Sequence, residues 1–307
     1  TVPVTVGNQF CLAFDGTAGG LLDANGIGTG FTMVDVPTQR IAADDPVTFA
    51  EIPGYEPRLL SVENGVLIMS APKGIQYRYI GYNSGSGQIV NSQVNQLGVG
   101  FDATSEFTLE VTILNEAVIP GNSAQGGIWF GLDEDNFVKL VRDTGRVQLQ
   151  VEVNGGTATD STATPEEINT TFAMAADDTV TLLLTIKPDT NEASAQFILN
   201  DGQPVDAGVL TIPASFTDGV LLPDGTTGPV SFGGLFNTYR NGNSSFDLEF
   251  DNFCITPDAP QIVSPTANDD AATVDAGSSV LIDVLDNDTD GTNAIDPTTV
   301  TDRKSVV

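Results

Sequence analysis

The chain has 307 residues, with 41 acidic and 11 basic side chains and no histidine, so its formal charge at pH 7 is −30. This charge excludes nucleic acid and anionic membrane surfaces as partners, because both need clustered lysine and arginine, and no apolar run approaches the ~20 residues of a membrane insertion. The absence of histidine also excludes Ser-His-Asp and Cys-His catalysis and every zinc site that needs imidazole.

The dominant sequence period is two, which predicts short β-strands separated by turns. The clearest pair of strands is joined by the turn residues Pro188–Asn191. A single helical turn could lie within Pro165–Ala176, and no long amphipathic helix is visible. More than ten short strands with Gly and Pro between them are typical of an all-β sandwich or jelly roll. In chain order, the expected strands include 59–63, 66–70, 107–114, 127–132, 136–142, 146–153, 179–187, 192–199 and 245–256.

The composition changes near Pro257, which predicts one large domain over residues 1–257 and a proline-containing linker over residues 258–267. Residues 268–301 resemble the first part of a bacterial cadherin-like or immunoglobulin-like repeat, which would then be cut off. Residues 302–307, Asp-Arg-Lys-Ser-Val-Val, are encoded by a common sequencing-adapter sequence. We therefore expect them to be read-through, with a natural tail as the alternative.

The large domain resembles the concanavalin A-like lectin/glucanase superfamily over roughly residues 7–257. The resemblance is carried by the stretches 14–34, Leu97–Asp102, Gly127–Leu140 and Phe250–Phe253. It implies a jelly roll of two curved antiparallel sheets, often with a structural calcium ion. It also implies glycan binding or hydrolysis, although a fold alone does not fix a function.

Hydrolysis by the retaining glucanases of this superfamily uses the string Glu-x-Asp-x-x-Glu on one strand, which this chain lacks. Asp247, Glu249 and Asp251 do share one strand face, because alternate residues of a strand point to the same side. The resemblance places Asp251 in the closing strand, away from the cleft. A solvated strand face or a metal site is therefore expected there, and no enzymatic activity.

Sugar binding needs aromatic side chains beside planar polar groups. With one Trp and five Tyr, the chain offers no broad aromatic platform, and Trp129 is expected in the core. Two clusters are candidate glycan contacts. The first is Tyr77, Tyr79 and Tyr82, for which packing beneath a long loop is the alternative. The second is Tyr239, Arg240 and Asn241.

The two cysteines lie near the two ends of the large domain, at Cys11 and Cys254. The first and last strands of a jelly roll often pair antiparallel, and a register that puts Cys11 opposite Cys254 would also bring Asp15 close to Asp251. We expect a disulfide bond in this register, stabilising the fold by about 4–5 kcal/mol because it closes a long loop. Two buried free thiols are the alternative.

Calcium is the expected metal, since it takes oxygen ligands from carboxylates. One predicted site uses Asp15 and Asp251, where two nearby carboxylates would repel without a cation. The second uses Asp286, Asp288 and Asp290 in the sequence Asp-Asn-Asp-Thr-Asp-Gly, for which an acidic surface turn is the alternative. The sequence around Asp133 favours a hairpin turn over a metal site.

The preferred interpretation is a non-catalytic carbohydrate-binding or adhesion module, stabilised by calcium, in a larger secreted or cell-surface protein. Its expected partners are a glycan or surface polysaccharide and other repeats of the same polypeptide. A glycoside hydrolase or lyase of the same superfamily and a purely structural spacer are the alternatives. The acidity also fits a saline habitat, which the sequence cannot separate from calcium dependence.

Overall fold

The chain forms two compact units, Thr1–Asp258 and Ala259–Val307, and their boundary lies one residue from the expected end of the large domain. Of the second unit only Thr273 and Asp275 are described, so the cadherin-like repeat lies outside the described residues. The computed structural model describes residues 9–34, 55–71, 95–114, 119–120, 124–133, 136–153, 167–173, 178–221, 229–238, 245–258, 273 and 275, and the backbone alone at 41–42, 77–78, 156–157 and 239.

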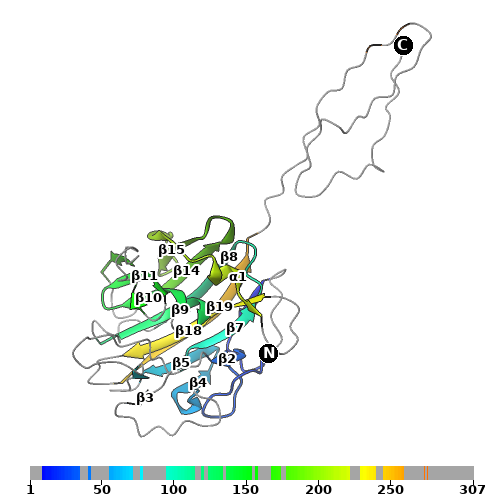
Figure 1. Ribbon diagram of the computed structural model, residues 1–307. Coiled ribbons are helices and arrows are strands. Elements are labelled where there is room, and N and C mark those ends of the chain that lie inside the picture. The colour runs from blue at the N-terminus through cyan, green and yellow to red at the C-terminus, as the bar shows by residue number, and fades with distance from the viewer. Residues whose placement is uncertain are drawn as a thin grey trace, which may run out of the picture. The chain divides into compact units, whose positions relative to one another are not determined.

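The first unit is a sandwich of two antiparallel sheets (Figure 1). We call the eight-stranded sheet sheet B; β1 (Phe10–Leu12) lies beside its strand β19. The order along the rest of sheet B is β16 (Val205–Thr211), β15 (Glu192–Leu199), β14 (Val180–Lys187), β8 (Phe107–Ile113), β19 (Phe246–Pro257), β5 (Val66–Ala71) and β4 (Leu60–Glu63).

The nine-stranded sheet is called sheet A. Its order is β12 (Gly156–Thr157), β11 (Arg146–Val153), β10 (Asn136–Asp143), β9 (Ala124–Asp133), β18 (Pro229–Tyr239), β7 (Leu97–Phe101) and β2 (Met33–Val34), with β13 (Glu167–Thr171) beside β11 and β17 (Val220–Leu221) beside β18. A separate pair consists of β3 (Ile41–Ala42) and β6 (Tyr77–Arg78).

The described helices are single turns: η1 (Pro57–Leu59), η3 (Pro188–Thr190) and α1 (Ser215–Asp218). None of them has the length or the apolar character needed to cross a membrane. The all-β sandwich is the predicted fold class, and the predicted strands appear with ends shifted by at most a few residues. The expected helical turn within Pro165–Ala176 is wrong for its middle, where Glu167–Thr171 pairs with β11 as a strand.

The main hydrophobic core lies between the two sheets and follows from the period of two. Along β8 and β14, every second side chain is buried and the intervening ones are partly exposed. Three phenylalanines from three strands meet at its centre, with ring centroids 5.0–5.9 Å apart: Phe101, Phe107 and Phe130. Such aromatic contacts add about 0.5–1.5 kcal/mol each beyond the burial of their area.

Arg142 of β10 is a buried cation at the edge of this core. Its guanidinium lies 4.5 Å from the ring centroid of Phe172, which in turn stacks on Phe197 of β15. This stack therefore connects sheet A to sheet B. Burial lowers the pKa of Arg142 to about 10, although the neighbouring Asp143 raises it, so the group stays charged at neutral pH.

The loop between β1 and β2 is organised by one buried carboxylate, Asp23. Its oxygens accept the backbone N–H groups of Asn25 and Ile27, and of Val62 in β4, at 2.8–2.9 Å. Burial alone would raise the pKa of Asp23, but these backbone hydrogen bonds together hold it below its usual value. Asp23 thus fastens the loop to the edge of sheet B.

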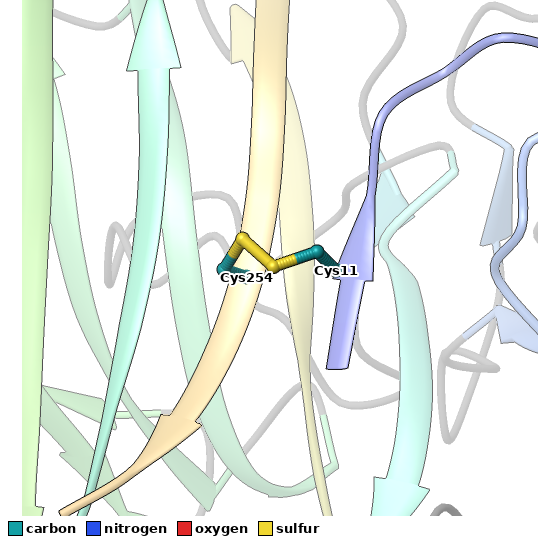
Figure 2. The surroundings of a disulfide bond; sticks show 2 residues. All are labelled: Cys11 and Cys254. Atoms are coloured by element: carbon teal, nitrogen blue, oxygen red, sulfur yellow. A yellow bond between two sulfur atoms is a disulfide. The ribbon is translucent and has the colours of Figure 1, made fainter. Parts of the chain in front are cut away.

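A disulfide bond joins β1 to β19, as predicted. Cys11 and Cys254 are opposite each other in the antiparallel register, with Cα atoms 4.2 Å apart, just under the usual range of about 4.4–6.8 Å (Figure 2). The described part of the chain has no free cysteine. The bond closes a loop of 243 positions, almost the whole sandwich.

Candidate functional site

The outer face of sheet A, which points away from the core, carries an unusual set of buried side chains. In β8 and β14 of sheet B the outward residues are partly exposed, whereas β10 and β11 are buried on almost every residue. The inward residues of β10 and β11 belong to the main core, so the alternate residues define the outer face.

One half of this face is apolar. We call Trp129, Phe137, Val141 and Phe236 the outer hydrophobic cluster; all four are fully buried, and Met33 and Phe232 pack against them. The indole N–H of Trp129 donates to the carbonyl of Leu97, two strands away, at 2.9 Å.

Glycine makes the reach of Trp129 possible. Gly234 of β18 and Gly98 of β7 stand in the same cross-strand row as Trp129. A Cβ atom on Gly98 would come within 2.9 Å of the indole ring, so only glycine leaves room for the ring against the sheet. The indole therefore extends across both glycines toward β7.

The other half of the face is polar and contains a buried ion pair. Lys139 of β10 and Glu152 of β11 lie diagonally across the two strands, and the Lys139 ammonium donates to the Glu152 carboxylate at 2.7 Å. Their side chains are only 7% and 6% exposed. An ion pair taken out of water is costly unless its geometry is good, as the 2.7 Å separation is here.

Amide side chains continue the polar half toward β13. Register places Gln148 opposite Asn169 and Gln150 opposite Glu167. The amide of Gln148 donates to Glu167 at 3.0 Å and to Asn169 at 3.2 Å, and it accepts from the amide of Gln125 of β9 at 3.1 Å. Gln150 and Asn169 also donate to Glu167, at 3.3 and 2.6 Å. We call this set the polar network: Gln125, Lys139, Gln148, Gln150, Glu152, Glu167 and Asn169.

The polar network grades from buried to exposed. Lys139, Gln148, Gln150 and Glu152 are buried, whereas Glu167 and Asn169 on β13 are exposed. Because its members hold one another by hydrogen bonds, their side-chain positions are set before any ligand arrives.

The outer face of sheet B differs. Threonine hydroxyls pair across β8 and β14, for example Thr108 with Thr185 at 2.7 Å. The predicted acidic triplet Asp247, Glu249 and Asp251 lies on this face of β19, and each member is at least partly exposed. The triplet therefore lies on a partly exposed strand face, which was one of the two expectations from the sequence, and not on the outer face of sheet A. Burial raises the pKa of Asp251 from its ordinary value, although the backbone of Asn252 lowers it.

The predicted glycan-contact residues fall largely outside the described part of the chain. Tyr77 and Tyr239 are described as backbone only, in β6 and at the end of β18, and Tyr79, Tyr82, Arg240 and Asn241 lie outside the described residues. Contact between these side chains and a glycan therefore stays a prediction. Trp129 is buried as expected, but in the outer hydrophobic cluster.

Calcium binding also stays a prediction. The strand β1 ends at Leu12, and Phe14 has a left-handed φ of 50°, so the chain turns out of the register from which Asp15 and Asp251 were placed together. Asp15 accepts the N–H and hydroxyl of Thr17, which lowers the pKa of Asp15. The described residues contain no group of three or more His, Cys, Asp or Glu suited to a metal, and Asp286, Asp288 and Asp290 lie outside them.

The polar network was missed by sequence reasoning, although one signal was present. In Arg146–Val153 the alternate residues Gln148, Gln150 and Glu152 are all polar groups that can hydrogen-bond with sugars. Glu167 could not be added, because its segment was interpreted as a helical turn.

Comparisons with known proteins establish no family. No family model matches the chain, and no curated protein matches it by sequence. Similar solved structures include a functionally unknown protein from Saccharomyces cerevisiae (14% identity, TM-score 0.44, covering 66% of this chain and 94% of that one). They also include a xylan β-1,4-xylosidase from Bacillus halodurans C-125 (16%, 0.43, 67% and 35%) and alginate lyase A1-II′, of polysaccharide lyase family 7 (13%, 0.38, 66% and 85%).

This chain thus spans about a third of the xylosidase, and similarity at this level transfers no residue roles. None of these three structures supports a cadherin-like repeat at residues 268–301.

The comparisons stand against the expectation that the domain is not an enzyme, because the similar solved structures include a glycoside hydrolase and a polysaccharide lyase; these likenesses by themselves assign it no activity. That expectation depended on the absence of histidine and of paired carboxylates along one strand. The structure shows the weakness of the second criterion: Glu152 of β11 and Glu167 of β13 reach the same sheet face from adjacent strands.

Proposed function

We propose that the outer face of sheet A binds a polysaccharide chain and that the domain cleaves it. The observation that carries this proposal is the polar network, a preorganised set of amides and carboxylates beside the outer hydrophobic cluster. A glutamine or asparagine amide both donates and accepts, as a sugar hydroxyl does, so a row of amides across a sheet suits a chain of sugar units.

Glu152 and Glu167 are the proposed pair of carboxyl groups. Gln150 pairs with Glu167 and Glu152 is two residues further along β11, so the two glutamates are diagonal neighbours. The α-carbons of such neighbours lie about 7–8 Å apart, and the carboxylates themselves are held by different partners, Glu152 by Lys139 and Glu167 chiefly by Gln148 and Asn169. Glycoside hydrolysis needs two carboxyl groups flanking the scissile bond, about 5–5.5 Å apart for retention and about 6.5–9.5 Å for inversion. Lys139 positions Glu152 by its 2.7 Å ion pair.

The test is an activity screen on polysaccharides with two readouts: new reducing ends, which report any cleavage, and absorbance of unsaturated ends, which reports elimination. We expect one or more polymers to be cleaved, and Glu152→Gln and Glu167→Gln each to lower the rate at least about a hundredfold, typical of losing an acid or base. Glu249→Gln, the same change on the outer face of sheet B, should keep the activity.

The melting midpoints of all three variants must be compared with that of the unchanged protein, so that unfolding is not taken for lost chemistry. If no polymer is bound or cleaved, or if Glu152→Gln and Glu167→Gln are as active as Glu249→Gln, the proposal fails.

We also propose a secreted or cell-surface location. The support is the Cys11–Cys254 disulfide, since such bonds persist in oxidising compartments. Protein produced in a bacterial periplasm should have no free thiol after denaturation. Cytoplasmic protein should have two and should melt at a lower temperature. Equal thiol contents and midpoints would remove this support.

Calcium dependence is a further proposal from the sequence. Melting of the full chain with calcium and with chelator tests it: a bound ion raises stability by about 2.7 kcal/mol at a hundredfold excess over its Kd. Asp15→Asn and Asp288→Asn then report which predicted site responds. Identical midpoints with calcium and with chelator would exclude a stabilising ion.

A further inference from the structure

We infer that the polysaccharide recognised by the outer face of sheet A is uncharged, and that cleavage is therefore hydrolysis rather than elimination. This inference rests on the proposed function and names its substrate class. It is carried by the charges of the face and by where each charge is already engaged.

The cations of the face are already paired. Among the described residues of this face, Lys139 and Arg146 are the only cations, since Arg142 points into the core against Phe172. Lys139 is held by Glu152 at 2.7 Å, and Arg146 by Asp143 at 2.6 Å. A uronate or sulfate group would need a cation to replace its water, and each of these two would first have to leave its carboxylate.

Carboxylates outnumber cations on the same face. Glu167 adds a third carboxylate to those of Glu152 and Asp143, and its partners Gln148, Gln150 and Asn169 are neutral amides. The charged groups named here, three carboxylates and two cations, sum to −1, on a chain whose formal charge is −30. A polyanion would meet repulsion both at long range and at contact, whereas hydroxyl groups match the amides.

The reaction type follows from the substrate class. Elimination removes a proton from the carbon next to a uronate carboxylate, so an uncharged sugar without that activating group does not react by this route. Hydrolysis breaks the bond between the anomeric carbon and the bridging oxygen. The water hydroxyl is added to that carbon, and a proton is delivered to the leaving oxygen. Glu152 and Glu167 are the pair of carboxyl groups that the proposed function assigns to those two transfers.

The closing experiment measures the retardation of the full chain in native gels containing polymers that differ in charge on the same backbone. Hydroxyethylcellulose is compared with carboxymethylcellulose, and a panel of linear xylan, arabinan and mixed-linkage glucan with alginate and polygalacturonate. Gels run at low and high salt, because repulsion is screened by salt. We expect retardation by one or more uncharged polymers, with apparent affinity at least about tenfold higher than for any charged one at low salt.

A matched pair of charge reversals locates the effect. Glu167→Lys changes the face by two charges and should create salt-sensitive retardation by the anionic polymers. Glu249→Lys makes the same change in net charge on sheet B and should not.

Stronger binding of an anionic polymer by the unchanged protein at low salt, or the appearance of unsaturated ends, would overturn the inference while leaving the proposed function standing. Retardation by no polymer in either group would remove the proposed function, and the inference with it.

Discussion

The outer faces of the two sheets come from the same alternation of side chains along their strands, yet they differ in how deeply the outward side chains are buried. On sheet B the outward positions of β8, β14 and β19 are mostly threonine and acidic residues and are at least partly exposed, as for Thr108, Thr185 and Asp247, although Leu183 and Lys187 also lie among them. On sheet A the outward positions of β10 hold Phe137, Lys139 and Val141, all buried. A sheet with one solvated face needs only the first arrangement.

The difference shows that burial, more than acidity, identifies the candidate site. The acidic triplet on β19 attracts attention in the sequence but lies on a partly exposed face. The ion pair of Lys139 and Glu152 is only two residues among many charges, yet both of its side chains are held out of water on an outer face. Removing charges from water without a functional return is disfavoured.

The largest expected effect is on the free energy of unfolding when the Cys11–Cys254 disulfide of sheet B is removed. Replacing both cysteines, as Cys11→Ser with Cys254→Ser, should lower the free energy of unfolding by about 4–5 kcal/mol, because the bond restricts a 243-position loop in the unfolded chain. Urea unfolding of the double variant measures this. The polar network on sheet A should keep its polymer binding at temperatures where the variant is folded. A loss below 1 kcal/mol would mean that β1 and β19 are held by their backbone pairing alone.

The second prediction compares two lysine–glutamate pairs directly. Lys139→Met removes the ammonium that donates to the buried Glu152 carboxylate at 2.7 Å and should cost about 3–5 kcal/mol. Lys187→Met breaks the pair with Glu106 on sheet B, whose N–O distance is 3.8 Å with both side chains 41% exposed, and should cost about 1 kcal/mol or less. Both follow from urea unfolding. Equal losses would contradict the contrast between the faces.

Features of the fold could be predicted from the sequence where the residues that determine them lie close together along the chain. The strands of a hairpin such as β14 and β15 can be predicted, because each alternating run and the turn that ends it lie within about ten residues of each other. The disulfide needed one long-range assumption, that the first and last strands pair, and that assumption holds. β13 was missed because none of its side chains is fully buried, so its sequence has no strong alternation. It forms a strand because it pairs with β11.

The candidate site was missed for a related reason. Lys139, Glu152 and Glu167 come from three separate strands, and only the registers of β10, β11 and β13 bring them to one face. A search for catalytic residues along one strand cannot find such a set. The outer hydrophobic cluster was equally hidden. The position of Trp129 depends on Gly98, 31 residues earlier in the sequence, and on Gly234, 105 residues later.

A third prediction tests the edge of sheet B through pH. The folded-state pKa of Asp23 is lowered, so its carboxylate contributes stability above the unfolded value of about 3.9 and loses that contribution as pH falls through the folded pKa. Asp23→Asn should therefore cost about 1.5–3 kcal/mol above about pH 5, through weaker hydrogen bonds to Ile27 and Val62, with a smaller cost in acid. Unfolding of both proteins at several pH values measures the difference. A cost independent of pH would exclude the ionised form as its cause.

The smallest expected effect separates a solvated ladder from a buried network. Thr108→Val on sheet B removes one hydroxyl from a partly exposed pair, and Thr185 can turn to water, so we expect a change within about 0.5 kcal/mol. Gln148→Leu on sheet A removes the shared partner of Gln125, Glu167 and Asn169 and should cost about 1–3 kcal/mol, because the partly buried Gln125 loses its hydrogen-bond acceptor. Gln148→Leu should also weaken retardation by the uncharged polymers, which Thr108→Val should leave unchanged. If both variants behave alike in unfolding and in polymer gels, the outer face of sheet A is no more specialised than that of sheet B.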